Sequence, residues 1–282
     1  MTLLAAFAYA AGSALSKYQT REYPVLMIVW ARYFMPLALI LAVFLPRRGV
    51  RMLRTAYPLV QIIRGVLLVS GTVLIVFAYR VMPLAEAQAI SFIHPVLLTM
   101  LAVIFLGEKV SPLGWAAVLI CFSGVLIIVR PGGELFTPAA ILPLGLAFTF
   151  SAFQIFTRLI AGKEDSINML FYALLVGSLA LSATLPFSWV TPTPKGMFFF
   201  VLVGLMSSSG YFFTIKSLEM APASLVAPFG YTQLLWAIIF GVLAFDDVPD
   251  VATLAGMATV VAGGLLVAAQ GRRQAGKPSE RE

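Results

Sequence analysis

The residues best suited to chemistry lie around the chain's single histidine. His94 stands directly before Pro95, about ten residues into a long apolar run. Proline removes a helix hydrogen bond and disfavours α-helical backbone at the residue before it. A break there would leave backbone carbonyls free beside an imidazole, a combination that can bind a small polar molecule. We take His94 as a candidate binding residue. A structural histidine, hydrogen-bonded to a neighbouring helix, fits the sequence equally well. A further hypothesis is that His94 carries protons.

Polar side chains recur at helical spacing on the same run. Gln88, Ser91 and Pro95 fall at offsets of 0, 3 and 7, which is one stripe of a helix. Serine and threonine in such stripes often bond only their own helix or allow close packing, whereas an amide in lipid needs a partner. With His94, Gln88 and Ser91, the candidate substrate-binding residues are Tyr9, Tyr79, Gln154, Tyr211, Tyr231, Gln233 and Trp236.

The composition excludes a water-soluble protein. Hydrophobic residues make up 61% of the 282 residues and charged residues only 11%, whereas soluble domains carry about 25% charged residues. The apolar runs are continuous and about 20 residues long, which is typical of membrane-spanning helices and not of barrel strands. We therefore predict an all-α polytopic membrane protein.

The runs predict ten transmembrane helices joined by short loops, followed by a polar tail at 271–282. With the N-terminus in the cytoplasm, 13 of the 19 Lys and Arg residues lie on the inner side, 5 on the outer side, and Arg32 lies within a span. The positive-inside rule then predicts that both termini are cytoplasmic. The predicted spans are 2–18, 25–45, 57–79, 84–106, 112–130, 138–159, 167–189, 195–217, 222–244 and 251–270.

The chain has the plan of two related halves, 1–134 and 135–270. A shift of 139 residues places His94 on Gln233 and Glu108 on Asp247, with no gap. Five spans in each half mean that the second half enters the membrane from the opposite face. This predicts an inverted repeat, a common build of secondary transporters. Pro95 and the break at Pro228 then become candidate hinges, one in each half.

Catalysis has little support in the residues. One histidine, one cysteine in an apolar run and no metal-ligand spacing argue against an enzyme or a metal site. No P-loop is present, so we expect no nucleotide-driven pumping and no cofactor. The net charge of +7 arises from loops and the tail, so no nucleic-acid partner is expected. The expected partners are a small-molecule substrate and the lipid bilayer, and the expected state is a monomer.

Several weak motifs recur in both halves at the constant offset. An acidic residue precedes the last helix of each half, and small residues follow 9 and 16 positions later. With these motifs the chain resembles the drug/metabolite transporter superfamily, specifically the EamA-type ten-helix exporters. The resemblance implies a bacterial inner-membrane exporter of small metabolites, in which four spans of each half surround a cavity. The motif residues are Glu108, Ala117 and Gly124 in the first half and Asp247, Gly256 and Gly263 in the second.

The expected function is secondary export of small metabolites by alternating access. Among such proteins the aromatic-rich, cation-poor interior is most similar to exporters of neutral and aromatic amino acids. The alternatives are a nucleobase, nucleotide-sugar or drug as cargo, or a membrane receptor or enzyme. Arg32 could meet a substrate carboxylate, but we favour an internal pairing or a side chain that extends toward the outer membrane surface.

Overall fold

The structure is a computed structural model that describes residues 1–49, 54–107, 110–129 and 138–275. The described chain is nearly all helical. Short 3₁₀ helices cover Pro138–Ala140 (η2) and Ala227–Tyr231 (η3). The α-helices are α1 Thr2–Gln19, α2 Val25–Arg48, α3 Pro58–Val81, α4 Leu84–Ser91, α5 His94–Leu106, α6 Pro112–Val129, α7 Ile141–Ile160, α8 Ser166–Ser182, α9 Leu185–Ser188, α10 Pro194–Met220, α11 Ala223–Val226, α12 Thr232–Phe245 and α13 Val251–Ala275.

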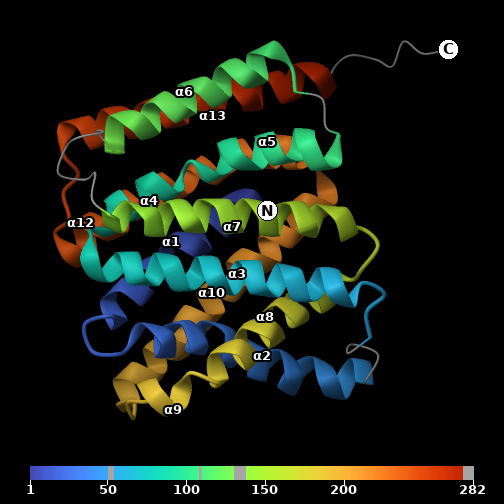
Figure 1. Cartoon of the computed structure of the whole chain (residues 1–282), viewed down its shortest axis with the longest axis vertical. Helices are drawn as coiled ribbons and strands as arrows, with labels where there is room; N and C mark the ends of the chain where they lie inside the picture. Colours follow the sequence, from blue (N-terminus) through green and yellow to red (C-terminus); the bar gives the residue numbers. More distant parts are fainter. Residues whose placement is uncertain (50–53, 108–109, 130–137, 276–282) are drawn as a thin grey trace.

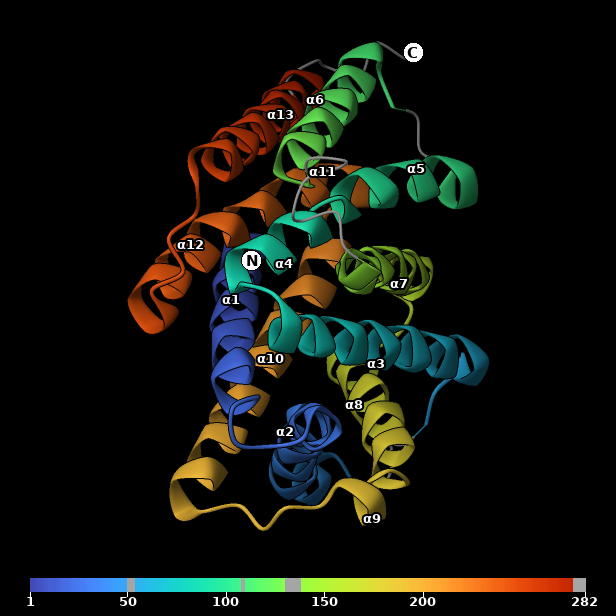
Figure 2. The ribbon, with the colours of Figure 1, turned by 60° about the vertical axis from the view of Figure 1, so that its left-hand side comes forward.

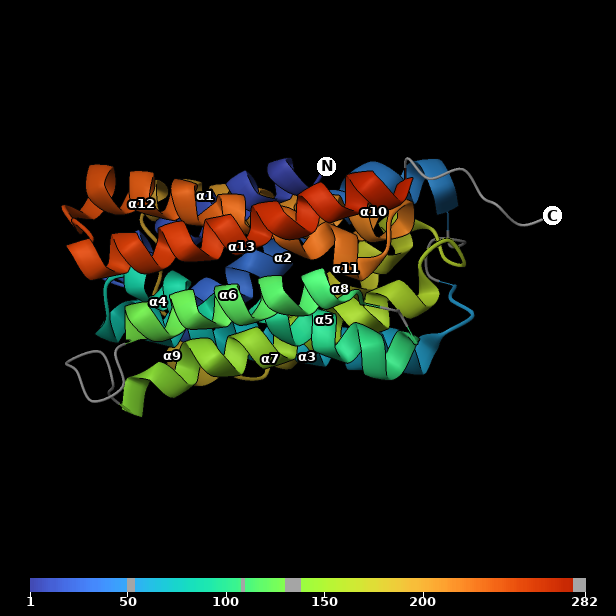
Figure 3. The same ribbon diagram turned by 90° about the horizontal axis from the view of Figure 1, so that it is seen from above.

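The long helices run side by side between two ends of the molecule (Figures 1 and 3). Five described segments are long and apolar enough to cross a membrane, and four shorter helices are also apolar. We call one end the Lys17 end, where α1, α3 and α12 finish. We call the other the Met220 end, where α5, α7 and α10 finish (Figure 1).

Each predicted span overlaps a helix, but three of the spans differ from the structure. The span at 84–106 is interrupted between α4 and α5 at Phe92–Ile93, and the span at 222–244 is divided into α11, η3 and α12. The span at 167–189 ends early, at Ser182. Pro186, which follows in α9, has no N–H to donate to the carbonyl of Ser182 four residues earlier, so the helix cannot continue through it.

The C-terminal boundary also differs. The sequence predicts that the last span ends at 270 and that a polar tail begins at 271, but α13 continues as helix through Ala275. The rest of the predicted tail lies outside the described residues.

Packing between helices is concentrated in a few pairs. α1 packs against α10 and α12, while α3 packs against α7 and α8, and α5 against α7. α6 and α13 lie against each other at one edge of the bundle, with α2 and α9 at the opposite edge (Figure 2). The bundle interior between these edges holds the largest buried cluster, which includes Tyr33, Phe153 and Phe200.

Small residues allow α6 and α13 to approach closely. A Cβ added to Gly124 would lie 2.7 Å from the carbonyl oxygen of Gly256, and one added to Gly263 would lie 3.0 Å from that of Ala117. In the 139-residue shift Ala117 corresponds to Gly256, and Gly124 corresponds to Gly263. The contacts are crosswise, because each one joins the first residue of one half to the second residue of the other half. These glycines are needed for helix packing.

Candidate substrate-binding cavity

A central cavity lies between the helices, with about 540 Å³ of space not filled by atoms when the solvent at its opening is included. The lining side chains come from α1, α2, α3, α4, α5, α7, α10 and α12, and are mixed aromatic, polar and aliphatic. They are Tyr9, Ser13, Arg32, Leu68, Thr72, Ile75, Tyr79, Gln88, Ser91, Phe92, His94, Leu146, Phe150, Tyr211 and Gln233.

Most of the predicted binding residues meet at this cavity. Seven of the ten line it: Tyr9, Tyr79, Gln88, Ser91, His94, Tyr211 and Gln233. Gln154 lines a neighbouring hollow. Tyr231 and Trp236 line neither: Tyr231 packs on Phe92 in the cluster beneath α6 and α13, and Trp236 packs on Phe7 of α1.

A hydrogen-bonded chain of two amides and a phenol crosses the cavity wall. The Nε2 of Gln233 donates to the Oε1 of Gln88 at 3.1 Å, and the Nε2 of Gln88 donates to the hydroxyl of Tyr79 at 2.6 Å. Each amide thus has a partner, as the cost of burying polar groups requires. The chain fixes three polar groups that face the same space, so they can orient a ligand.

The helix break places His94 at the centre of the site. Its Nδ1 lies 3.2 Å from the carbonyl oxygen of Ser91, within the interrupted turn. The carbonyl of His94 accepts a hydrogen bond of 2.8 Å from the hydroxyl of Ser151 on α7. The imidazole packs between the rings of Phe92 and Phe150, each at 5.4 Å between ring centres. The broken segment is therefore held by groups from both halves of the chain.

Two tyrosine hydroxyls at the cavity pair with threonine hydroxyls. The Tyr9 hydroxyl is 2.9 Å from the Thr214 hydroxyl, and the Tyr211 hydroxyl is 3.4 Å from that of Thr72. The rings of Tyr9 and Tyr211 lie 5.5 Å apart. These rings offer flat apolar faces, with polar groups at their edges, to a ligand that carries a planar ring.

Arg32 adopts the internal pairing, one of the two arrangements favoured from the sequence, and does not reach the membrane surface. Its side chain turns inward, is only 4% exposed and lines the central cavity. Its Nη1 donates to the hydroxyl of Ser16 at 2.9 Å, which is the internal pairing the sequence analysis allowed. The cavity therefore contains a buried positive charge.

The apolar part of the lining, Phe92 and Phe150 above all, was not predicted from the sequence. Phe150 touches both Tyr9 and His94, and Phe92 touches His94. A signal for Phe150 was available, because it lies four residues before Gln154 on the same helical face. Phe92 lies in the interrupted turn itself, where a helical pattern gives no guidance.

Three hollows connect the middle of the bundle to the Met220 end. The central cavity and the second hollow share Tyr9, His94, Phe150 and Gln233. The second and third hollows share Thr2 and Val226, and the third also touches Met220 and Phe229. A ligand could pass along this row if the shared aromatic side chains moved aside.

Comparison with solved structures shows that the fold is a known one. A protein crystal structure superposes with a TM-score of 0.74 at 22% sequence identity, covering 97% of this chain and 98% of the other.

Several characterised transporters are similar in sequence. A riboflavin transporter of Rhizobium johnstonii is 30% identical over 84% of this chain and 78% of its own. An S-adenosylmethionine uptake transporter of Rickettsia bellii is 29% identical over 94% and 91%. A pseudopaline exporter of Pseudomonas aeruginosa is 24% identical over 93% and 92%.

A family profile covers almost the whole chain. The profile of the EamA-like transporter family matches residues 1–130 and again residues 137–269. The sequence features that indicated this family are therefore confirmed at the level of the family, while the cargo differs among the similar proteins. This chain belongs to the EamA-like transporter family.

Proposed function

We propose that the chain is a secondary carrier that moves a small metabolite across the bacterial inner membrane through the central cavity. The observation that carries this proposal is the cavity itself, which lies in mid-bundle and is lined by polar and aromatic side chains from both family-matched segments. Buried polar groups within a membrane span usually mark a substrate path. Alternating access would then expose the cavity first to one end of the bundle and then to the other.

The proposed architecture is ten spans in two inverted five-helix repeats, 1–134 and 135–270. It is supported by the two family matches and by the paired packing, in which α1 with α10 corresponds to α3 with α7. The crosswise glycine contacts of α6 and α13 have the same symmetry. The Lys and Arg distribution supports a cytoplasmic Met220 end with both termini inside.

The proposed cargo is a neutral or aromatic amino acid. The tilted and edge-to-face rings of the cavity offer aromatic surface to a planar side chain. The buried guanidinium together with the amides suits a zwitterionic group. S-adenosylmethionine is the second candidate, since it joins an amino-acid end to a planar ring and is the cargo for which the Rickettsia bellii relative is named. The similar proteins include both uptake transporters and an exporter. We therefore propose that the direction of net transport, export included, follows the gradient of substrate or coupling ion across the membrane.

Flux into proteoliposomes tests the proposal. Purified protein without nucleotide would be offered radiolabelled phenylalanine, tyrosine, leucine, S-adenosylmethionine and riboflavin, with protein-free liposomes as the control. We expect saturable flux of at least one ring-bearing amino-acid compound. Absence of flux for all five would overturn the cargo assignment and direct the search to nucleobases and drugs.

The same assay with an imposed pH gradient assigns a role to His94. Flux that ignores the gradient would define a facilitator in which His94 binds substrate or holds the helix break. Flux that follows the gradient, and loses this response in His94→Asn, would make His94 the proton carrier.

A further inference from the structure

Arg32 occupies an unusual electrostatic position. Among the described residues that line the central cavity, none is Asp or Glu, so the guanidinium faces this space without an acidic neighbour on the cavity wall. Its Nε has no hydrogen-bond partner among the described groups. A buried charge without compensation is costly, which favours a ligand that supplies the opposite charge.

The surroundings hold the guanidinium in a fixed place. Arg32 Nη1 donates to Ser16, whose hydroxyl in turn donates to the carbonyl oxygen of Gly12 at 2.6 Å. The ring of Phe92 and the amide of Gln88 line the same cavity. A positively charged corner and a flat apolar face therefore lie in one site.

We propose that Arg32 forms the subsite for an oxyanion, most simply a carboxylate, on a ring-bearing substrate. This inference deepens the proposed function and rests on the central cavity being the binding site. Arginine pairs with carboxylate and phosphate oxygens through charge-assisted hydrogen bonds, so both groups share the recognising chemistry.

Simple probes test the subsite without knowledge of the cargo. Thermal unfolding of the purified protein would be titrated with benzoate, the uncharged isostere benzamide, and phenyl phosphate. We expect benzoate to bind at least about tenfold more tightly than benzamide, and Arg32→Gln to abolish the difference while Arg32→Lys retains part of it. Arg80→Gln, which removes an exposed cation at the end of α3, is the matched control and should behave as the wild type.

Equal binding of benzoate and benzamide by the wild type would overturn the subsite, as would an unchanged preference in Arg32→Gln. Stronger binding of phenyl phosphate than of benzoate would assign the site to phosphate-bearing solutes. If the subsite is correct but the cargo is not an amino acid, amino-acid flux will be absent while the protein still binds benzoate more tightly than benzamide.

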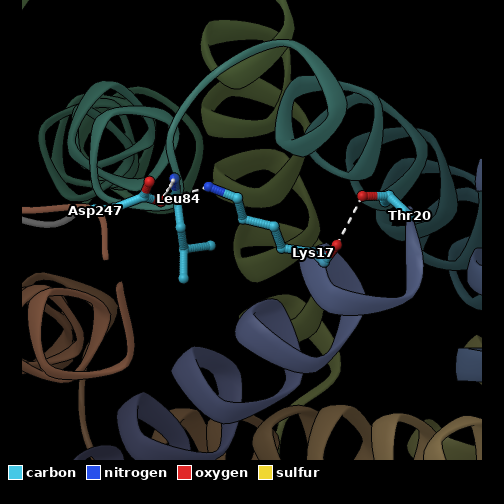
Figure 4. Close-up of polar contacts among 4 residues, drawn as sticks. All are labelled: Lys17, Thr20, Leu84 and Asp247. Carbon is cyan, nitrogen blue, oxygen red and sulfur yellow. Dashed lines mark hydrogen bonds and ion pairs between the residues drawn. The ribbon is translucent and has the colours of Figure 1, made fainter. Parts of the chain in front are cut away.

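A second feature, independent of the cavity, lies at the Lys17 end. The Nζ of Lys17 is 2.5 Å from the Oδ2 of Asp247, and both side chains are mostly buried, at 14% and 22% exposed. The same carboxylate oxygen accepts the backbone N–H of Leu84 at 3.2 Å. Figure 4 shows Lys17 and the Leu84 nitrogen converging on Asp247. One carboxylate thus joins the last turn of α1, the first residue of α4 and the loop before α13.

The loop that carries Asp247 is itself fixed. Asp246 adopts a left-handed conformation with φ of 57°, and the Asp247 N–H donates to the carbonyl of Gly241 at 3.1 Å. The Lys17 ammonium also lies 4.8 Å from the centre of the Phe245 ring, a cation–π contact. A partly buried pair held in this way contributes more than an exposed one.

We infer that the Lys17–Asp247 pair is the latch that keeps the cavity closed at the Lys17 end. The three hollows described above lead from the central cavity toward the Met220 end. The contact joins α1, α4 and the loop that follows α12, so these segments cannot separate at the Lys17 end while it is intact. The inference rests on alternating access but not on any particular cargo.

Cysteine accessibility measures the latch directly. In a Cys121→Ala background, Ser13→Cys places a thiol in the cavity one helical turn before Lys17 on the same face of α1. A membrane-impermeant methanethiosulfonate reagent is then applied in separate experiments to each face of the membrane, so that the assay does not depend on the orientation. We expect Asp247→Asn and Lys17→Gln to raise the labelling rate several-fold from the face at the Lys17 end.

The double variant Lys17→Asp with Asp247→Lys should label more slowly than either single variant, because the ion pair is remade with its charges exchanged. The recovery should be partial, because a lysine at position 247 cannot accept the Leu84 N–H. Lys216→Gln breaks the ion pair of Lys216 with Glu219 near the Met220 end and is the matched control, with unchanged labelling expected from the face at the Lys17 end. Unchanged labelling in both single variants of the latch would overturn the inference. Faster labelling that the charge exchange fails to reverse even in part would also overturn it, because the change would then reflect general loosening.

Discussion

Gln233 on α12 donates a hydrogen bond of 3.1 Å to Gln88 on α4, across 145 residues of sequence. The two glutamines belong to the two segments matched by the family profile, and both face the central cavity. The bond continues to Tyr79, so one polar chain connects three helices at the candidate site. The two segments therefore meet through specific polar contacts as well as apolar packing.

The glutamine pair should show measurable coupling. In a double-mutant cycle with Gln88→Leu and Gln233→Leu, we expect a coupling energy of about 0.6 kcal/mol and at most about 1.7 kcal/mol, the range for hydrogen bonds between membrane helices. Unfolding of the purified protein in mixed micelles measures it. Strict additivity of the two single changes would contradict a direct bond between the amides.

Loss of the Tyr79 hydroxyl should raise the KM for transport more than a change of the Trp236 ring does. Tyr79→Phe removes the acceptor of the 2.6 Å bond from Gln88 and frees an amide at the site, so we expect a KM several-fold higher. Trp236→Phe changes only the packing on Phe7 and Phe240, so its KM should stay within about twofold. The initial rates of flux for the two variants decide between these expectations, and equal KM values would contradict them.

The crossing of α6 and α13 should not tolerate one added methyl group. A Cβ at position 256 would lie 2.6 Å from the Gly124 carbonyl oxygen and 2.4 Å from Ile128, so Gly256→Ala should destabilise the protein by about 1–3 kcal/mol. Gly241→Ala is the matched control, because its added Cβ has only ordinary contacts beginning at 3.6 Å. Thermal unfolding compares the two. An equal loss of stability in Gly256→Ala and Gly241→Ala would contradict the prediction, because it would show that α13 can shift away from α6 to accept the methyl group.

The helix breaks should control the rate of transport. Pro95→Ala restores a backbone N–H after the interrupted turn and favours one continuous helix through 84–106. We expect a several-fold lower turnover with little change in KM, and the same direction of change for Pro228→Ala. Initial rates in proteoliposomes measure both variants. Wild-type rates in both would remove the hinges from the mechanism.

Continuous apolar runs and helical stripes predicted much of this molecule. They placed a helix at every expected span and brought Gln88, Ser91 and His94 to one cavity, because apolar length and a 3.6-residue period directly reflect how helices bury their faces. The break beside His94 followed from Pro95 alone. These inferences needed only local sequence.

The remaining features depend on which helices become neighbours. Arg32 turns inward because Ser16 on α1 receives its guanidinium, a partner that the residues around position 32 do not indicate. Trp236 faces Phe7 and not the cavity because of the way α12 lies on α1. The break in the second half spreads over η3, since Ala227–Tyr231 forms a 3₁₀ turn and not a single kink.

Blocking the cavity tests most directly whether it is the transport path. In the Cys121→Ala background, Ser91→Cys places a thiol on the cavity wall, and Phe187→Cys places one at a side chain that is 91% exposed. After reaction with a bulky methanethiosulfonate reagent, the flux of a transported radiolabelled amino acid is measured for both variants. We predict that labelling at position 91 stops flux and that labelling at position 187 leaves it unchanged. Undiminished flux through protein fully labelled at position 91 would contradict the central cavity as the transport path.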